Sequence, residues 1–218
     1  MLVGDWMSRN VVTATEDMSM IKAGRMLRER KIRRLPVVDR EGRLVGIVSE
    51  RDLKAASPSG ATTLDMYEMT YLLSEMKLKG IMTKSPRSIR PGDTVERAAL
   101  VMRDLKIGSL PVVDADNKVV GIITDTDIFR LFVSITGIDQ DGIQIGLRLG
   151  TSEGSLKPVL DALRGHEARI ISILSSYDRT DATRRDVSIR IQGLPETRER
   201  ELRAVLDKTC QVLSWTRD

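Results

Sequence analysis

The sequence contains very little of what most catalytic centres are built from. It has one histidine, His166, and one cysteine, Cys210, among 218 residues. A lone cysteine excludes a disulfide within the chain and fits a reducing compartment, so we expect a cytoplasmic protein. Zinc sites with paired histidines or cysteines are excluded, and neither a nucleophile-elbow motif nor a glycine-rich phosphate loop is present. We therefore expect no enzyme activity and no required metal or cofactor.

Long apolar segments are also missing. No stretch approaches the roughly 18 to 20 apolar residues of a membrane span, and the N-terminus has no features of a secretory signal. Aromatic residues make up only 3%, and the 35 basic residues are interspersed with 31 acidic ones, which leaves a net charge of +4. A nucleic-acid footprint requires clustered positive charge. We therefore expect a soluble protein without a membrane partner, and nucleic acid is a disfavoured partner.

The feature that the sequence does have is an internal repeat. Shifting the chain by 75 residues places Lys31–Asp39 on Lys106–Asp114 and Val45–Ile47 on Val120–Ile122. Over residues 5–53 and 80–128 there are 14 identities in 49 gapless pairs, and ten of them lie within 31–47. Chance gives only a few identities, so the chain contains a duplication.

Both copies predict the same order of elements. Apolar residues at helical spacing predict helices over 20–27 and 95–102. Two buried strands follow, at 35–38 and 44–48 or at 110–113 and 119–123, joined by a turn in which Gly42 or Asn117 tolerates a positive φ. A second helix begins near Ser49 or Thr124. Between the copies, residues 57–60 predict a break and residues 64–79 a linker helix.

These residues resemble a known domain. The pattern Leu-Pro-Val-Val-Asp, a turn, Val-Gly-Ile and then Ser/Thr-x-x-Asp is similar to the CBS domain, here as a tandem pair (a Bateman module) over roughly 1–135. We expect the repeats at 1–56 and 80–136, with the linker at 57–79. The resemblance implies β-α-β units packed sheet to sheet around two clefts that bind an adenosyl small molecule, with AMP, ADP, ATP and S-adenosylmethionine as candidates.

The physical case for a ligand site lies at two strand-to-helix junctions. A helix N-terminus offers unpaired N–H groups and a positive dipole end, which suit phosphate. Ser49 and Thr124 can add a hydroxyl there, while Asp52 and Asp127 can accept hydrogen bonds from ribose. The same spacing also resembles a capping box, which would recur in both copies without any ligand. Both interpretations remain open from the sequence.

The CBS resemblance also implies which segments face each other across the clefts. One cleft is expected to combine one copy's helix start with the other copy's adenine-contacting residues: Val12, Ile32, Arg33, Thr124, Thr126 and Asp127. The second cleft is expected to combine Ser49, Arg51, Asp52, Arg87, Ile107 and Gly108.

The two clefts differ at matching positions of the repeat. Val12 is small and apolar, as an adenine face requires, whereas its counterpart Arg87 is long and charged. Arg87 can obstruct a base or contact phosphate. We therefore expect the Asp127 cleft to be the better nucleotide site. Arg33 could stack on adenine, pair with phosphate or remain a solvated surface residue.

The last third of the chain predicts a separate α/β unit over 142–218. Residues alternate in polarity at 143–149 and 187–191, apolar residues at 156–163 and 202–206 have helical spacing, and 169–174 and 210–215 predict further strands. This β-α-β-β-α-β order is the ferredoxin-like plan and resembles an ACT domain. Of that family's usual Asp-x-x-Gly loop, only Gly154 is present, so a role in dimerisation is at least as well supported as amino-acid binding.

The arrangement CBS–CBS–ACT over the whole chain resembles the AcuB-like acetoin-utilisation proteins. The sequence thus favours a regulatory sensor that binds an adenosyl ligand between the CBS repeats and relays binding to the C-terminal domain or to a protein partner. The alternative is a ligand-independent scaffold that forms a homodimer through the CBS pair and the ACT-like domain.

Overall fold

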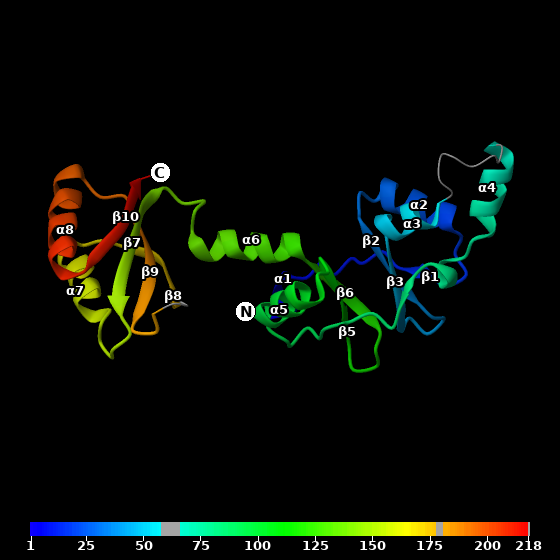
Figure 1. Cartoon of the computed structure of the whole chain (residues 1–218), viewed down its shortest axis with the longest axis horizontal. Helices are drawn as coiled ribbons and strands as arrows, with labels where there is room; N and C mark the ends of the chain where they lie inside the picture. Colours follow the sequence, from blue (N-terminus) through cyan, green and yellow to red (C-terminus); the bar gives the residue numbers. More distant parts are fainter. Residues whose placement is uncertain (58–65, 178–180, 218) are drawn as a thin grey trace. The chain divides into compact units, whose positions relative to one another are not determined.

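The computed structural model describes residues 1–57, 66–177 and 181–217, and these form two compact units, 1–128 and 129–218. The first unit holds both copies of the repeat (Figure 1). The first copy and the segment that leads into it contain α1 (Val3–Trp6), β1 (Ala14–Thr15), α2 (Met20–Glu29), β2 (Arg34–Val38), β3 (Leu44–Ser49) and α3 (Glu50–Ala56). The elements of the second copy are β4 (Thr83–Lys84), α5 (Val95–Leu105), β5 (Ser109–Val113), β6 (Val119–Thr124) and the start of α6 (Asp125–Thr136).

The 75-residue repeat reappears in the strand pairing. In the first copy β2 pairs with β3, and in the second β5 pairs with β6, with Pro36 opposite Ile47 and Pro111 opposite Ile122. The segment before each helix crosses to the other copy: Ser8 pairs with Ile122, and Thr83 pairs with Ile47. The second copy therefore contributes β4 as an edge strand of the first copy's sheet, and the first copy contributes an isolated bridge to the β5-β6 pair.

Two glycines leave room for the segments that cross between the copies. A Cβ atom at Gly46 would lie 2.3 Å from Met82 Sδ, and a Cβ at Gly121 would lie 2.3 Å from Met7 Sδ. Both methionines are 8% exposed. The Val-Gly-Ile motif thus needs its glycine because a methionine of the other copy occupies the space where a side chain would be. The predicted turns also form as expected, with φ of 80° at Gly42 and 62° at Asn117.

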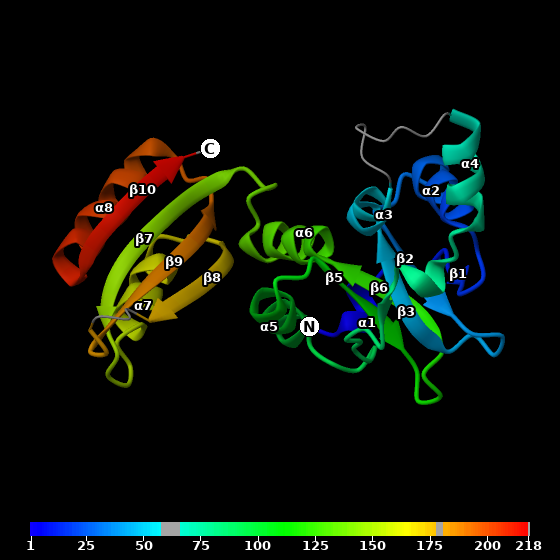
Figure 2. The ribbon, with the colours of Figure 1, turned by 45° about the vertical axis from the view of Figure 1, so that its right-hand side comes forward.

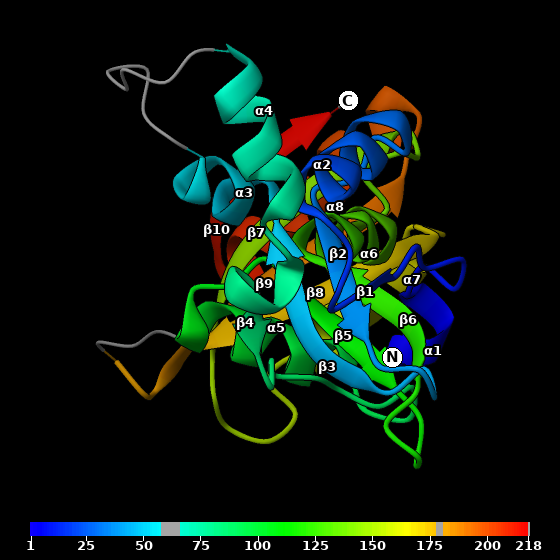
Figure 3. The ribbon, with the colours of Figure 1, turned by 90° about the vertical axis from the view of Figure 1, so that its right-hand side faces the viewer.

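The linker differs from the helix expected over 64–79. Of that range, residues 64 and 65, like residues 58–60 of the predicted break, lie outside the described residues. Helix α4 covers Met66–Glu75, and Leu78–Gly80 form a 3-10 turn. The chain is extended at Lys77, which bridges to Ser19, and fully buried Leu78 packs in the core of the first copy. Tertiary pairing thus ends the helix early, and α4 lies beside α2 (Figure 3).

The second unit has the predicted element order β-α-β-β-α-β. Its elements are β7 (Gly142–Gly150), α7 (Lys157–Gly165), β8 (Ile170–Tyr177), β9 (Arg184–Gln192), α8 (Glu196–Thr209) and β10 (Gln211–Arg217). The antiparallel sheet has the strand order β10-β7-β9-β8, and both helices cover one face (Figure 2). Alternate apolar residues of β7 and β9 pack against Val159, Leu163, Leu202 and Leu206 of the helices. Val205, expected on the buried helix face, is 39% exposed.

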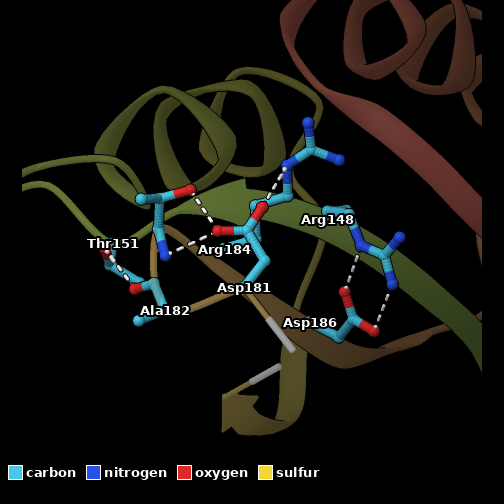
Figure 4. A network of polar contacts seen from close by, with 7 residues as sticks. Arg148, Thr151, Asp181, Ala182, Arg184 and Asp186 are labelled. Atoms are coloured by element: carbon cyan, nitrogen blue, oxygen red, sulfur yellow. Dashed lines mark hydrogen bonds and ion pairs between the residues drawn. The ribbon is translucent and has the colours of Figure 1, made fainter. Parts of the chain in front are cut away.

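The opposite face of this sheet is polar. Arg148 on β7 donates two hydrogen bonds to Asp186 on β9, at 2.8 and 2.9 Å (Figure 4). On the same face, Gln144 of β7 donates a hydrogen bond to Ser188 of β9. At the end of α6, the Thr136 carbonyl accepts a hydrogen bond from Ser172 Oγ at 2.8 Å. The end of α6 is therefore fastened to the polar face of the C-terminal sheet.

Candidate adenosyl-ligand clefts

Two Schellman motifs present the Lys-Ile dipeptide of each repeat. At the end of α2, Lys31 N–H bonds to the Arg28 carbonyl and Ile32 N–H bonds to the Leu27 carbonyl. At the end of α5, Lys106 and Ile107 make the same two bonds to Arg103 and Met102. This motif requires a left-handed residue at its first position, and both lysines are left-handed, with φ of 51° and 54°. Each helix end therefore directs Lys, Ile and the following residue to a cleft.

One cleft, here called the apolar cleft, has a volume of about 410 Å³. It combines the crossing segment of the first copy, the end of α2 and the start of α6. Its apolar wall consists of Val11, Val12, Ile32 and Ile122, and its polar rim of Ser8, Asn10, Thr124, Thr126, Lys31, Arg33, Arg34 and Asp125. The structure thus brings together five of the six residues expected at the Asp127 cleft, and an apolar slot beside cationic side chains suits a base next to phosphate.

The second cleft, here called the basic cleft, has a volume of about 530 Å³. It combines the end of α5 with the start of α3, and its cations are Arg33, Arg34, Arg51, Arg103 and Lys106. The other lining residues are Ser49, Glu50, Met102, Ile107, Gly108 and Asp125. Of the six residues expected here, Arg87 and Asp52 do not line the cleft. Arg87 is exposed and lines a separate hollow with Asp93 and Arg97.

The two aspartates of the Ser/Thr-x-x-Asp motifs act as helix caps. Asp127 Oδ2 accepts hydrogen bonds from Thr124 N–H at 2.9 Å and from Thr124 Oγ1 at 2.7 Å, and Asp127 N–H donates back to Thr124 Oγ1. Ser49 and Asp52 form the same capping box. Asp127 is only 3% exposed and does not line the apolar cleft. The capping interpretation of the motif is therefore realised in both copies, and each cap holds the Ser or Thr residue that lines its cleft.

A shared wall separates the clefts. Arg34 donates a hydrogen bond to the Gly108 carbonyl at 3.0 Å, and a Cβ at Gly108 would lie 2.7 Å from both Arg34 Nη2 and Asp125 Oδ2. The counterpart of Arg34 in the second copy is Ser109, which is buried at 4% exposure. Only the first copy therefore places a long cation on this wall, and the absence of a side chain at Gly108 gives it room.

Sequence reasoning missed several lining residues, and some of them carried a detectable signal. Lys31 and Lys106 are identities of the repeat, and both copies have an acid after the Ser/Thr, Glu50 or Asp125. The hydrogen bond and charge of Lys54, at 2.9 Å, together with Arg33 and Arg28, hold the pKa of Glu50 below its ordinary value. The repeat gave no indication of Arg34, because its counterpart in the second copy is Ser109.

The lone histidine and cysteine lie in the C-terminal unit, and neither of them lines one of these clefts. His166 Nδ1 lies 2.8 Å from the Ala162 carbonyl, and Cys210 Sγ contacts the Leu206 carbonyl at 3.6 Å, so each is engaged at its own helix end. Burial, followed by the charge of Asp207, raises the pKa of the Cys210 thiol. Among the residues with assigned structure, no group of His, Cys, Asp or Glu is arranged to hold a metal ion.

None of the helices in the described part of the chain is both long enough and apolar enough to cross a bilayer.

Known proteins match the first unit. The CBS domain model matches twice, at residues 3–59 and 78–134. A Vibrio cholerae protein assigned as the acetoin utilization protein AcuB is 32% identical, with a TM-score of 0.53, over 64% of this chain and 95% of that one. Arabidopsis thaliana CBSX2 in complex with AMP is 35% identical, with a TM-score of 0.52, over 62% of this chain and 98% of that one.

A third solved structure is the CBS domain pair of protein MJ0100 with 5′-methylthioadenosine and S-adenosyl-L-methionine. It is 32% identical, with a TM-score of 0.51, over 61% of this chain and 95% of that one. By contrast, the chain spans about a quarter of the length of a homoserine O-acetyltransferase from Methanohalobium evestigatum, so the match does not extend over most of that enzyme. The two family matches together cover more than half of the chain, and the chain therefore belongs to the CBS domain family, of which it carries a tandem pair.

Proposed function

We propose that this protein is a regulatory module that binds an adenine nucleotide or a related adenosyl ligand in the apolar cleft. The observation that carries the proposal is the cleft itself, where an apolar wall that includes Val12 and Ile32 adjoins Arg33 and the capped start of α6. The ligands named in the CBSX2 and MJ0100 structures all contain adenosine, which supports this class. The six residues expected at the Asp127 cleft remain the proposed contacts, with Asp127 acting on ribose or through Thr124.

Helix α6 is the proposed relay to the C-terminal unit. It is a continuous helix of 12 residues, about 18 Å long. Asp125 and Thr126 at its start line the apolar cleft, and Thr136 at its end is held by Ser172 of the C-terminal sheet. A ligand that binds more tightly when the start of α6 is in one of two positions would raise the fraction of molecules in which the whole helix is in that position.

The C-terminal unit is proposed to be an ACT-like, ferredoxin-like domain with a role in dimerisation. Its support is the strand order and the placement of both helices on one face. Of the ACT loop, Gly154 retains the left-handed conformation, with φ of 75°, but the loop carries no aspartate.

Calorimetric titration of the full chain with AMP tests the binding proposal, and two variants at one position separate the roles of Asp127. Asp127→Asn keeps an oxygen that can accept both bonds from Thr124 but replaces the other oxygen with a donor. If Asp127 accepts from ribose, Asp127→Asn lowers AMP affinity about tenfold, because a hydrogen bond to a charged group is lost. Asp52→Asn is the matched control and leaves AMP affinity unchanged.

The results that contradict the proposal are equally defined. Full AMP affinity in Asp127→Asn would mean that Asp127 acts only as a helix cap. A loss of AMP affinity in Asp127→Ala would then come from a misplaced Thr124 hydroxyl. Absence of heat and of any Tm shift with AMP, ADP, ATP and S-adenosylmethionine refutes the binding function itself. The scaffold alternative predicts that outcome together with a Tm that rises with protein concentration.

A further inference from the structure

The two clefts adjoin along one wall. Arg33, Arg34 and Asp125 line both of them, one side of the wall facing an apolar slot and the other a cationic one. Volumes of about 410 and 530 Å³ each fall in the range that holds small ligands or parts of them. The two clefts are therefore immediate neighbours, with Arg33 and Arg34 within reach of a ligand in either one.

The basic cleft carries positive charge that its own acids do not neutralise. Glu50 is paired with Lys54, Arg103 is paired with Asp104, and Asp125 is the other acid that lines the cleft. Three exposed cations remain, and in the described ranges none of them makes an ion pair: Arg33, Arg51 and Lys106. Unpaired guanidinium and ammonium groups that converge on one hollow are suited to phosphate oxygens.

The basic cleft has fewer apolar lining residues than the apolar cleft. By the 75-residue repeat, the counterparts of Val12 and Ile122 are Arg87 and Ile47, and neither lines this cleft. The apolar side chains that do line it are Met102, which is 5% exposed, and Ile107, the counterpart of Ile32, which is 37% exposed. The two clefts therefore differ in composition, since one has a wall of four apolar side chains and the other has five cations.

Lys106 adds an independent observation. It occupies a left-handed position, where a residue with a side chain is disfavoured and glycine is the usual occupant. Strained backbone of this kind is concentrated at functional sites. A lysine held at this helix end directs a cation into the basic cleft at a cost in stability.

We infer that a single nucleoside polyphosphate occupies both clefts, with its base and ribose in the apolar cleft and its outer phosphates on Arg33, Arg51 and Lys106. This inference rests on the proposed function and specifies its ligand class. It favours ATP and ADP over AMP. It disfavours S-adenosylmethionine, whose sulfonium and ammonium groups would be repelled by these cations.

Titration of the full chain with AMP, ADP, ATP and S-adenosylmethionine tests the inference. Affinity is expected to rise with each phosphate, at one ATP per chain, with no binding of S-adenosylmethionine. The variant Arg51→Ala/Lys106→Gly is expected to lower ATP affinity about tenfold or more and to leave AMP affinity within about twofold, because only the outer phosphates reach these cations. Glycine at position 106 also relieves the left-handed backbone strain, so we expect this variant to fold as stably as the wild type.

The matched control is Lys22→Gln/Arg25→Ala, which removes two exposed cations of α2 that line neither cleft. ATP affinity is expected to stay at the wild-type value. Two ATP molecules per chain, equal loss of AMP and ATP in the cleft variant, or an ATP affinity no higher than that of AMP would overturn the inference while leaving the AMP site intact. Failure of all adenosyl compounds to bind refutes the proposed function as well.

Discussion

Replacement of Gly121 by alanine probes how the crossing segment forms one wall of the apolar cleft. The new Cβ would lie 2.3 Å from Met7 Sδ, 3.0 Å from Cγ and 3.2 Å from Cε. Ordinary contacts between such atoms are about 3.5–4.0 Å long, so the Met7 side chain must move by more than about 1 Å in a packed site. Ser8, the next residue, pairs with Ile122 and lines the cleft, so the displacement reaches the ligand site.

The expected cost of Gly121→Ala is about 1–3 kcal/mol of unfolding free energy, the usual range for overpacking. Gly46→Ala is expected to cost the same amount, because Met82 approaches it at the same three distances. Gly92→Ala is the control, since nothing lies within 4 Å of its Cβ, and it should stay within about 0.5 kcal/mol of wild type.

Urea unfolding in a Trp215→Phe background measures these values. Only Trp6, in the first unit, then reports by fluorescence, so unfolding of the C-terminal unit does not mix into the signal. In the double variant Met7→Ala/Gly121→Ala the clash is gone, so its destabilisation should be about 1–2 kcal/mol smaller than the sum of the single variants. Additive costs, or a Gly121→Ala value equal to that of Gly92→Ala, would refute the close-packing argument.

Two further predictions concern single residues. Lys106→Gly is expected to raise stability by about 1 kcal/mol over Lys106→Ala, because only glycine relieves the left-handed conformation; equal thermal stability of the two variants would contradict this. Glu199→Gln is expected to destabilise the C-terminal unit by about 1–2 kcal/mol at pH 7, because Glu199 accepts hydrogen bonds from Arg217 and, at 2.7 Å, from Trp215. Burial raises the pKa of Glu199, but the bonds from Arg217 and Trp215 outweigh burial and hold the pKa below its ordinary value. This stabilisation is present above the unfolded carboxyl pKa and is lost as the pH falls through the folded value, so the difference in unfolding free energy between chains with and without Glu199→Gln should close in acid. Urea unfolding in a Trp6→Phe background measures it, because only Trp215 then reports by fluorescence; a difference independent of pH would argue against the charged form.

The amino-acid sequence by itself determined the duplication, the CBS pair and the order of elements in both units. Local signals suffice for these features, because the apolar period, the prolines that open β2 and β5, and the turn residues Gly42 and Asn117 act within a few residues of chain. The expectation that Val12, Ile32 and Arg33 lie beside Thr124 and Thr126 came from the CBS resemblance, and all five residues line the apolar cleft.

Only the tertiary structure decided which motif residues reach the clefts. The Ser/Thr-x-x-Asp spacing is compatible with capping and with ribose binding, and the capping bonds of Asp52 and Asp127 depend on side-chain geometry. The linker helix ended early because Lys77 and Leu78 gain pairing and burial in the first copy. The division into an apolar and a basic cleft depends on Arg34, which reaches the Gly108 carbonyl across the repeat, and a contact between residues 74 positions apart leaves no local signal in the chain.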